Sequence, residues 1–187
     1  MAFKGEIPFF FRSPFNDKSS DTQVNPEAHE NLHPNLKKVV IVRHGHYDEK
    51  RGSLDDIGKK QITDLGEKIL KTKKEENLSA LILSSTALRA MESSEVLSKA
   101  IDASIEQHEV LYVDFSPDRR QLQATLELIS MKSMCASMLI LVTHAPICVK
   151  FPVLFGKSAL SQEWNEEFVE NGKALLIDLK SRNKSHL

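Results

Sequence analysis

Short runs of apolar residues alternate along this chain with longer segments in which apolar residues recur every three or four positions. The short runs indicate strands covered on both faces, as in a parallel sheet, and the longer segments indicate helices with one buried face. The predicted strands are Lys38–Arg43, Ala80–Leu83, Ser104–Gln107, Met138–Thr143 and Ala174–Leu179. The predicted helices are Ile57–Lys71, Leu88–Ala100, Asp118–Met131 and Pro146–Leu154. This order predicts an α/β fold, a three-layer α/β/α sandwich with a mostly parallel central sheet.

The segment before the first strand differs from the rest in composition. It contains an aromatic cluster made of Phe9, Phe10, Phe11 and Phe15. We therefore divide the chain into an N-terminal arm, residues 1–36, and one domain, residues 37–187. The arm is either an unstructured leader or a segment whose rings dock on the domain or on a second subunit, because exposed aromatic clusters seldom stay unburied. The second alternative leaves a homodimer open.

Composition excludes several classes of function. The chain has 187 residues and a net charge of −1, so bulk electrostatics favour neither a nucleic acid nor a membrane surface. No stretch approaches the ~20 apolar residues of a membrane span, and the aromatic start is too interrupted for a signal peptide. Cys135 and Cys148 lack metal or redox spacing, which indicates free thiols in a reducing compartment, the cytoplasm.

The first predicted strand ends in two groups that can bind an anion. Residues 39–42 are all β-branched, and Arg43, His44 and Gly45 follow them directly. Ligand-binding groups in open α/β sheets lie beyond the carboxyl ends of the parallel strands. The sequence therefore places a guanidinium and an imidazole side by side where a ligand would bind.

Two later junctions between a strand and a helix add groups of the same kind. The second strand leads through Ser84 and Ser85, which we expect to act as caps, into a helix that carries Arg89 near its start. The fourth strand is followed by His144, and Pro146 suits the first turn of the next helix. Two imidazoles, two guanidiniums and helix N-termini thus gather at one sheet edge. This set of groups suits a phosphoryl group.

At this point the chain resembles the histidine phosphatase superfamily, also called phosphoglycerate-mutase-like. That family has Arg-His-Gly after its first strand, then Leu-Thr-x-x-Gly-x-x-Gln at a helix start, Ser-Ser-Pro-x-x-Arg-Ala-x-Glu-Thr, and a late histidine after another strand. The matching segments here are Arg43–Gly45, Leu54–Gln61, Ser84–Ser93 and Thr143–His144. The resemblance covers about Lys37 to Leu179 and implies the histidine-phosphatase fold, with an antiparallel last strand at the sheet edge.

Several positions depart from the family pattern. The mild departures are Asp55, Thr86 and Ser93, which stand where the family has Thr, Pro and Thr. Tyr47 resembles the mitochondrial protein Ser/Thr phosphatase branch. The general acid is the larger departure, because the family's Glu position holds Val113. Asp114 is the nearest replacement, and Glu109 is the other candidate.

The interval between Arg89 and His144 holds one helix, a strand, a loop and another helix. Phosphoglycerate mutases and sugar bisphosphatases carry a sizeable inserted cap there, for which this chain has no room. It therefore resembles the small cap-less branch, similar to bacterial phosphohistidine phosphatases and the protein Ser/Thr phosphatases. An open site favours a phosphorylated protein as substrate, with small phosphomonoesters as the alternative.

The resemblance implies an enzyme, a phosphatase that hydrolyses phosphomonoesters or phosphoramidates through a phosphohistidine at His44. Neutral imidazole is a good nucleophile near physiological pH and splits one difficult step into two. The implied catalytic residues are His44, Arg43, Arg89, His144 and Asp114. The implied substrate-binding residues are Arg43, Arg89, His144, Gly45 and His46. This mechanism needs no metal and no organic cofactor.

Two other functions remain open from the sequence. His44, His46 and Asp48 match the beginning of the His-x-His-x-Asp-His zinc signature of metallo-β-lactamase-like hydrolases, although Glu49 replaces the last histidine. A catalytically inactive module that only binds phosphate is the second alternative, since the general acid is uncertain.

Overall fold

The structure is a computed structural model in which residues 32–187 are described. The aromatic cluster and the expected leader or docking role of residues 1–31 lie outside the described residues. Within residues 32–187 no helix is both long enough and apolar enough to cross a membrane.

The elements follow the predicted alternation closely. The strands are β1 (Lys38–Arg43), β2 (Ala80–Ser84), β3 (Ser104–Gln107), β4 (Met138–Thr143), β5 (Ala174–Asp178) and β6 (Asn183–His186). The helices are α1 (Asp56–Glu75), α2 (Leu88–Ile101), α3 (Arg119–Lys132) and α4 (Ala145–Phe155), with a 3-10 turn η2 (Glu109–Leu111) and a π-helical turn η3 (Gly156–Leu160). Asp55 and Asp118 cap α1 and α3 by accepting the N–H groups of Gly58 and Gln121.

The six strands form one sheet in the order β3-β2-β4-β1-β5-β6. The pairs among β1, β2, β3 and β4 are parallel, and β5 and β6 are antiparallel to their neighbours. The predicted mostly parallel sheet and the antiparallel β5 are confirmed. The prediction that β5 lies at the edge is wrong, because β6 pairs with it and forms the edge instead.

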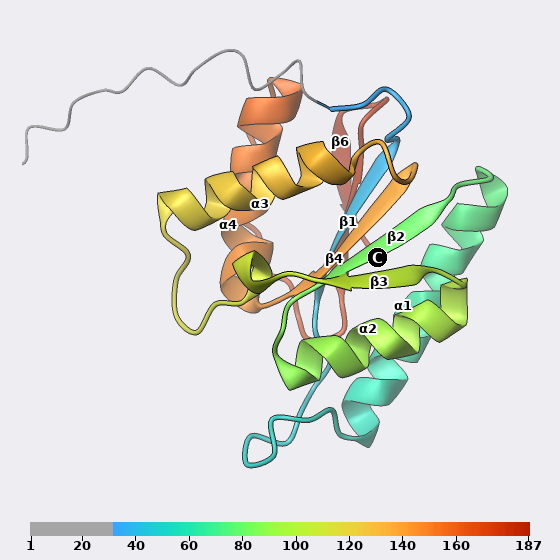
Figure 1. The fold of residues 1–187 in the computed structure, drawn as a ribbon, viewed down its shortest axis with the longest axis vertical. Helices are drawn as coiled ribbons and strands as arrows, with labels where there is room; N and C mark the ends of the chain where they lie inside the picture. The colour runs from blue at the N-terminus through green and yellow to red at the C-terminus, as the bar shows by residue number, and fades with distance from the viewer. Residues whose placement is uncertain (1–31) are drawn as a thin grey trace, which may run out of the picture.

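Helices cover both faces of the sheet, as Figure 1 shows, with α3 and α4 on one side and α1 and α2 on the other. Successive side chains of a strand point to opposite faces. Val39 and Ile41 of β1 accordingly pack in the core shared with α3 and α4, and Val40 and Val42 pack in the core shared with α1 and α2. A strand buried on both faces must be apolar at every position, which explains the run of β-branched residues.

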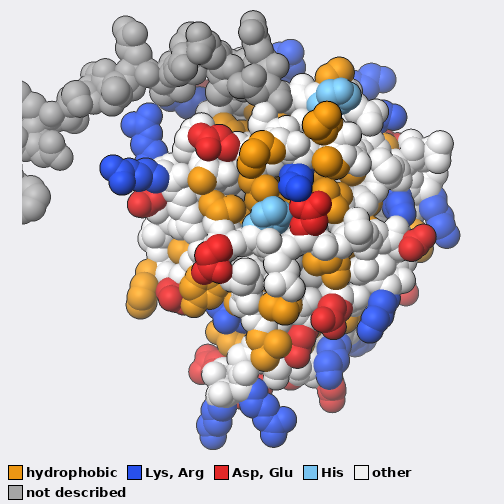
Figure 2. Space-filling model, in the orientation of Figure 1, with side chains coloured by type: hydrophobic (Ala, Val, Ile, Leu, Met, Phe, Trp, Pro, Cys, Tyr) orange, Lys and Arg blue, Asp and Glu red, His pale blue; other side chains and the backbone are white. Residues whose placement is uncertain are grey.

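The carboxyl ends of the parallel strands point the same way, so α2 and α4 both begin at one edge of the sheet. The chain between Arg89 and His144 forms the rest of α2, β3, η2, α3 and β4, and no additional domain lies in that interval. On the face seen in Figure 2, Lys and Arg side chains are interspersed with Asp and Glu. This distribution agrees with the near-zero net charge.

Candidate active site

His44 follows β1 and is buried, with 4% of its surface exposed. Its Nδ1 lies 2.9 Å from the carbonyl oxygen of Gly45. A carbonyl oxygen can only accept, so Nδ1 carries the proton of the neutral ring and donates it there. The lone pair of His44 is therefore on Nε2, the atom that faces the other site residues.

His144 is the N-cap residue of α4 and is also buried. Its Nε2 lies 2.9 Å from Oγ of Ser85, and its ring centroid is 5.2 Å from that of His44. The two imidazoles that the sequence placed after different strands thus lie next to each other. Ser85 holds the second one in place.

Arg89 joins the two histidines. Its Nε donates to Nε2 of His44 at 3.1 Å, and its Nη2 donates to Nδ1 of His144 at 3.1 Å. Because a guanidinium can only donate, both acceptor nitrogens are unprotonated, and Nε2 of His144 donates to Ser85. The planar fork of arginine makes this double contact feasible, which a single ammonium group cannot reproduce.

Arg43 completes the set of four residues. Its Nη1 donates to the carbonyl oxygen of Val169 at 3.1 Å. Its Nε is buried and has no hydrogen-bond partner among residues 32–187. Buried polar atoms without partners are rare in proteins, so this N–H is a donor available for an anionic ligand.

The site lowers the pKa of both histidines. Burial, with help from the charges of Arg89 and Arg43, lowers the pKa of His44 to about 4 against the opposing effect of the Gly45 hydrogen bond. Burial, with His44 and the two guanidiniums, lowers the pKa of His144 to about 3. Both rings are therefore neutral at pH 7, and Nε2 of His44 can act as a nucleophile.

Three aromatic rings surround these groups. Tyr47 makes an edge contact with His44, its ring centroid 5.2 Å away, and lies under the guanidinium of Arg89. Tyr112 makes an edge contact with His144, and Phe168 lies against the guanidinium of Arg43, 5.3 Å from its Cζ. The rings confine the cationic and imidazole groups to one small region.

Helix α2 supports the loop that follows β1. The N–H of Gly45 donates to Oγ of Ser93, and the N–H of Leu54 donates to Glu92. Glu92 thus ties the loop to the helix that carries Arg89. Gly45 binds Ser93 through its N–H and His44 through its carbonyl oxygen, so both its main-chain groups are already engaged.

The acid candidates lie on the segment after β3. Val113, at the family's Glu position, is buried in the core. Asp114 is exposed and accepts a hydrogen bond from the hydroxyl of Tyr112, the ring that touches His144. Glu109 accepts a hydrogen bond from Oγ1 of Thr86 at 2.6 Å. Both carboxylates lie at the rim of the site, and Asp114 is linked to His144 by way of Tyr112, whose hydroxyl it binds and whose ring contacts His144.

His46 has its side-chain partner outside the cluster of four residues. Its side chain is half-exposed and pairs with Asp55, the cap of α1, while Asp48 accepts the N–H groups of Lys50 and Arg51. The three side chains of the partial zinc signature therefore have separate partners. Within residues 32–187 no group of three or more His, Cys, Asp or Glu side chains could hold a metal ion.

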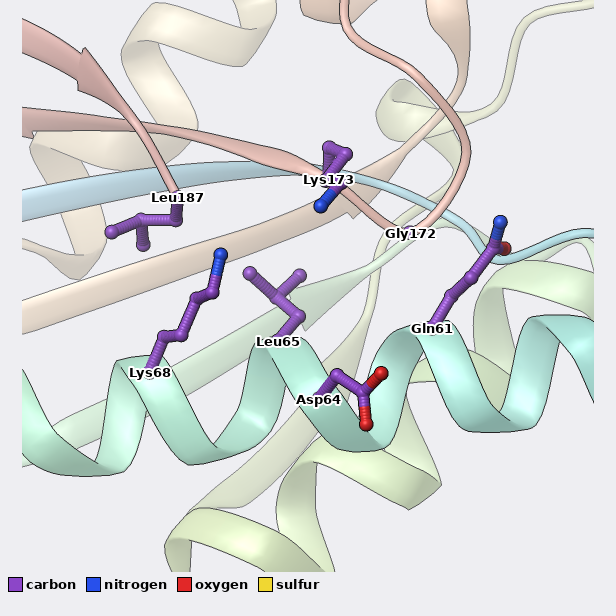
Figure 3. Close-up of a pocket in the computed structure, with 7 residues that line it drawn as sticks. All are labelled: Gln61, Asp64, Leu65, Lys68, Gly172, Lys173 and Leu187. Atoms are coloured by element: carbon purple, nitrogen blue, oxygen red, sulfur yellow. The ribbon is translucent and has the colours of Figure 1, made fainter.

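A small pocket lies beside the site, between α1 and the turn before β5. Figure 3 shows Lys68 and Asp64 of α1 on one side and Lys173 on the other. Its volume is about 80 Å³, and its charges are of both signs. Ligand pockets commonly have volumes of about 300 Å³ or more, so this pocket suits water molecules rather than a substrate.

The structure also places near the site residues that the sequence analysis did not assign to it. These are Ser85, expected only as a cap, together with Tyr112, Phe168, Val169 and Asn171. Ser85 directly follows β2, whose carboxyl end lies at the predicted ligand-binding edge of the sheet, and that position could have assigned it to the site. Val169 contacts Arg43 through its main-chain carbonyl oxygen, which every residue type has, so the sequence cannot indicate this contact.

The fold occurs in several solved structures, although no protein-family model matches the sequence and no curated protein is similar to it. The protein histidine phosphatase SixA complexed with tungstate is 17% identical, with a TM-score of 0.58, and the match covers 80% of this chain and 94% of that one. A mycobacterial glucosyl-3-phosphoglycerate phosphatase in complex with VO3 is 14% identical, with a TM-score of 0.56, over 81% and 97% of the two chains. A phosphoglycerate mutase from Plasmodium falciparum is 17% identical, with a TM-score of 0.51, over 81% and 88%.

Proposed function

We propose that this chain, which has the histidine-phosphatase fold, is a phosphatase that acts through a phosphohistidine at His44. The observation that carries the proposal is the position of Arg89, whose guanidinium donates to Nε2 of His44 and Nδ1 of His144 at once. A phosphoryl group at that position would have a nucleophile in front of it and cationic donors around its oxygens. The substrates are phosphomonoesters or phosphoramidates.

In the first step the lone pair of Nε2 on His44 attacks phosphorus. The new P–N bond forms while the bond between phosphorus and the leaving oxygen or nitrogen breaks, and the leaving group takes a proton from Asp114. In the second step water attacks the phosphohistidine, the P–N bond breaks, and phosphate leaves. The proton of that water returns to the acid, and Nε2 regains its lone pair.

Arg89 and His144 stabilise the charge that develops, and Arg43 contacts the phosphoryl oxygens equally in the bound substrate and in the transition state. Arg43 and Arg89 bind phosphoryl oxygens, and the unpartnered Nε–H of Arg43 gives one such contact without breaking an existing bond. For His144 to donate to a phosphoryl oxygen, its Nδ1 must take up a proton from solvent and give up the hydrogen bond from Arg89. The N-termini of α2 and α4 add favourable dipoles.

The substrate is a phosphorylated protein on this proposal. No inserted domain covers the site in the interval between Arg89 and His144, so a phosphoryl group displayed on a large partner can reach it. One protein of the same fold is named as a protein histidine phosphatase. The exposed position of Asp114 favours leaving groups that need little help from an acid, such as an imidazole or a phenol. Cys135 and Cys148 are both free thiols, which supports a cytoplasmic location.

The test is turnover of an aryl phosphate by the wild-type protein and by His44→Ala, each with and without excess EDTA. His33→Ala serves as the control, because His33 is exposed and its Nδ1 accepts the N–H of Asn35 outside the site. We expect EDTA-resistant activity that is lost only in His44→Ala. A trapped, acid-labile phosphoryl group on the wild-type protein should likewise disappear in that variant.

Other results would favour the alternatives. Activity that EDTA abolishes would support a metal-dependent hydrolase that uses His44, His46 and Asp48. A wild-type protein that binds phosphate but turns over no substrate would support the inactive binding module.

A further inference from the structure

The side chain of Arg43 is held from one side by residues 165–172, a segment without helix or strand that precedes β5. The carbonyl oxygen of Val169 accepts from Nη1 of Arg43, and the ring of Phe168 lies against the guanidinium. Phe168 itself is 68% exposed. The place of the guanidinium therefore depends on where the 165–172 segment lies.

The same segment contacts the main chain at the end of β1. The N–H of Gly172 lies 3.1 Å from the carbonyl oxygens of both Arg43 and His44. The side-chain amide of Asn171 donates to the carbonyl oxygen of Gly45, which also accepts from Nδ1 of His44. The segment thus touches the nucleophile as well as the arginine.

On its other side the 165–172 segment is tied to β6. Glu167 accepts from Nζ of Lys184 at 2.6 Å and lies 2.9 Å from Nε2 of His186. Lys184 also donates to the carbonyl oxygen of Asn165, and its side chain is only 10% exposed. A largely buried lysine with two oxygen partners fixes its neighbours more firmly than a surface ion pair would.

We infer that Glu167 is a positioning residue: by tying the 165–172 segment to β6 it orients Arg43 for the phosphoryl oxygens. The inference rests on the proposed function, and it assigns a task to β6, which carries no residue of the candidate site. Glu167 lies next to Phe168, so a shift of its carboxylate moves the residues that touch Arg43. Arg43 holds the phosphoryl group throughout the reaction, and uniform binding of that kind affects KM rather than kcat.

The experiment compares Glu167→Gln with Glu106→Gln. Glu106 is a matched control on β3, the opposite edge strand, where it pairs with one lysine and one histidine, Lys132 and His108. The two carboxylates are almost equally exposed, at 39% for Glu167 and 38% for Glu106. Lys184→Met is a second test variant, because it removes the ammonium group but keeps an apolar stem beside Trp164.

For Glu167→Gln and Lys184→Met we expect KM for an aryl phosphate and Ki for inorganic phosphate to rise together by about 3- to 10-fold. The change in kcat should stay within about 2-fold. Hydrogen exchange at the amides of residues 169–172 should become faster in both variants. Glu106→Gln should leave KM, Ki and exchange in this segment at their wild-type values.

Wild-type KM and Ki in Glu167→Gln, or an equal change in Glu106→Gln, would overturn the inference. A loss of kcat without a change in KM would overturn it as well. The proposed function is judged separately, from the wild-type protein: if that neither turns over an aryl phosphate nor binds phosphate, the proposed function fails and the inference fails with it.

Discussion

Gly45 and Gly58 lie in backbone contact, which brings the residue after the candidate nucleophile against the first turn of α1. A Cβ atom on Gly45 would come within 2.7 Å of the carbonyl oxygen of Gly58, and one on Gly58 would come within 1.9 Å of the carbonyl oxygen of His46. Neither glycine has a positive φ, so close packing rather than backbone conformation requires them. Two glycines from separate sequence motifs thus form a single contact.

Gly58→Ala should destabilise the protein, although alanine is the better helix former. The new methyl group meets backbone atoms that cannot move aside without displacing the loop after His44. We expect a loss of about 3 kcal/mol in the free energy of unfolding, measured by urea denaturation, which is at the upper end for overpacking. Lys59→Ala, at the exposed neighbouring position, should change the free energy of unfolding by less than about 0.5 kcal/mol.

Arg89→Lys should abolish most of the activity while keeping the charge. A lysine cannot donate to both histidines at once, and it lacks the fork that binds two phosphoryl oxygens. We expect kcat/KM for an aryl phosphate to fall about 100- to 1,000-fold. Arg182→Lys on the exposed turn before β6 is the control, and equal losses in both variants would contradict a specific role for Arg89.

Acidification should weaken the folded state through His44 and His144. Their pKa values are about 4 and about 3 in the folded protein, below the ordinary value of 6.5. The unfolded chain therefore binds more protons at low pH, and stability that is fully present above pH 6.5 is lost as pH falls toward 3. Urea unfolding between pH 7 and pH 4 should show a steeper loss for the wild type than for a His44→Asn, His144→Asn double variant. Equal slopes would show that the two rings are not held neutral by burial.

The contribution of the acid should depend on the leaving group. Asp114→Asn should lower kcat about 100-fold for an alkyl phosphate, whose alkoxide needs a proton, and by less than about 3-fold for an activated aryl phosphate. Glu109→Gln is the parallel variant at the other candidate carboxylate. The variant whose fall in kcat depends more strongly on the leaving group identifies the acid. If the fall in kcat depends on the leaving group in neither variant, neither carboxylate is the acid.

Much of the fold follows from the apolar pattern of the sequence. The predicted bounds of β1, β3 and β4 are those observed. For β1 and β4 the signal is clear, because each is a nearly continuous apolar run that is buried along its length. The strand β6 was not predicted, since Asn183, Lys184, Ser185 and His186 carry no apolar residue. Its pairing comes from the free edge of β5, which is a property of the assembled sheet.

The candidate site could likewise be predicted from the sequence only in part. His44, Arg89 and His144 follow strands or begin helices, so parallel-sheet geometry alone predicts that they converge, and the structure brings them together. Two other contacts join chain segments that meet only in the folded protein. They are the hydrogen bond between Ser85 and His144 and the hydrogen bond from Arg43 to Val169. The position of Ser85 directly after β2 could have assigned it to the site, but local sequence shows neither its contact with His144 nor the contact of Val169 with Arg43.

Arg89 donates to two imidazoles, those of His44 and His144, and this affects how the site would release its product. An incoming phosphoryl group must exchange hydrogen bonds with Nε2 of His44 and Nδ1 of His144 rather than meet a free guanidinium. The net affinity for phosphate is therefore smaller than the strength of the new contacts suggests. On the proposed function, the two imidazoles would take back the guanidinium when phosphate departs, so this arrangement competes with the product and favours the next turnover.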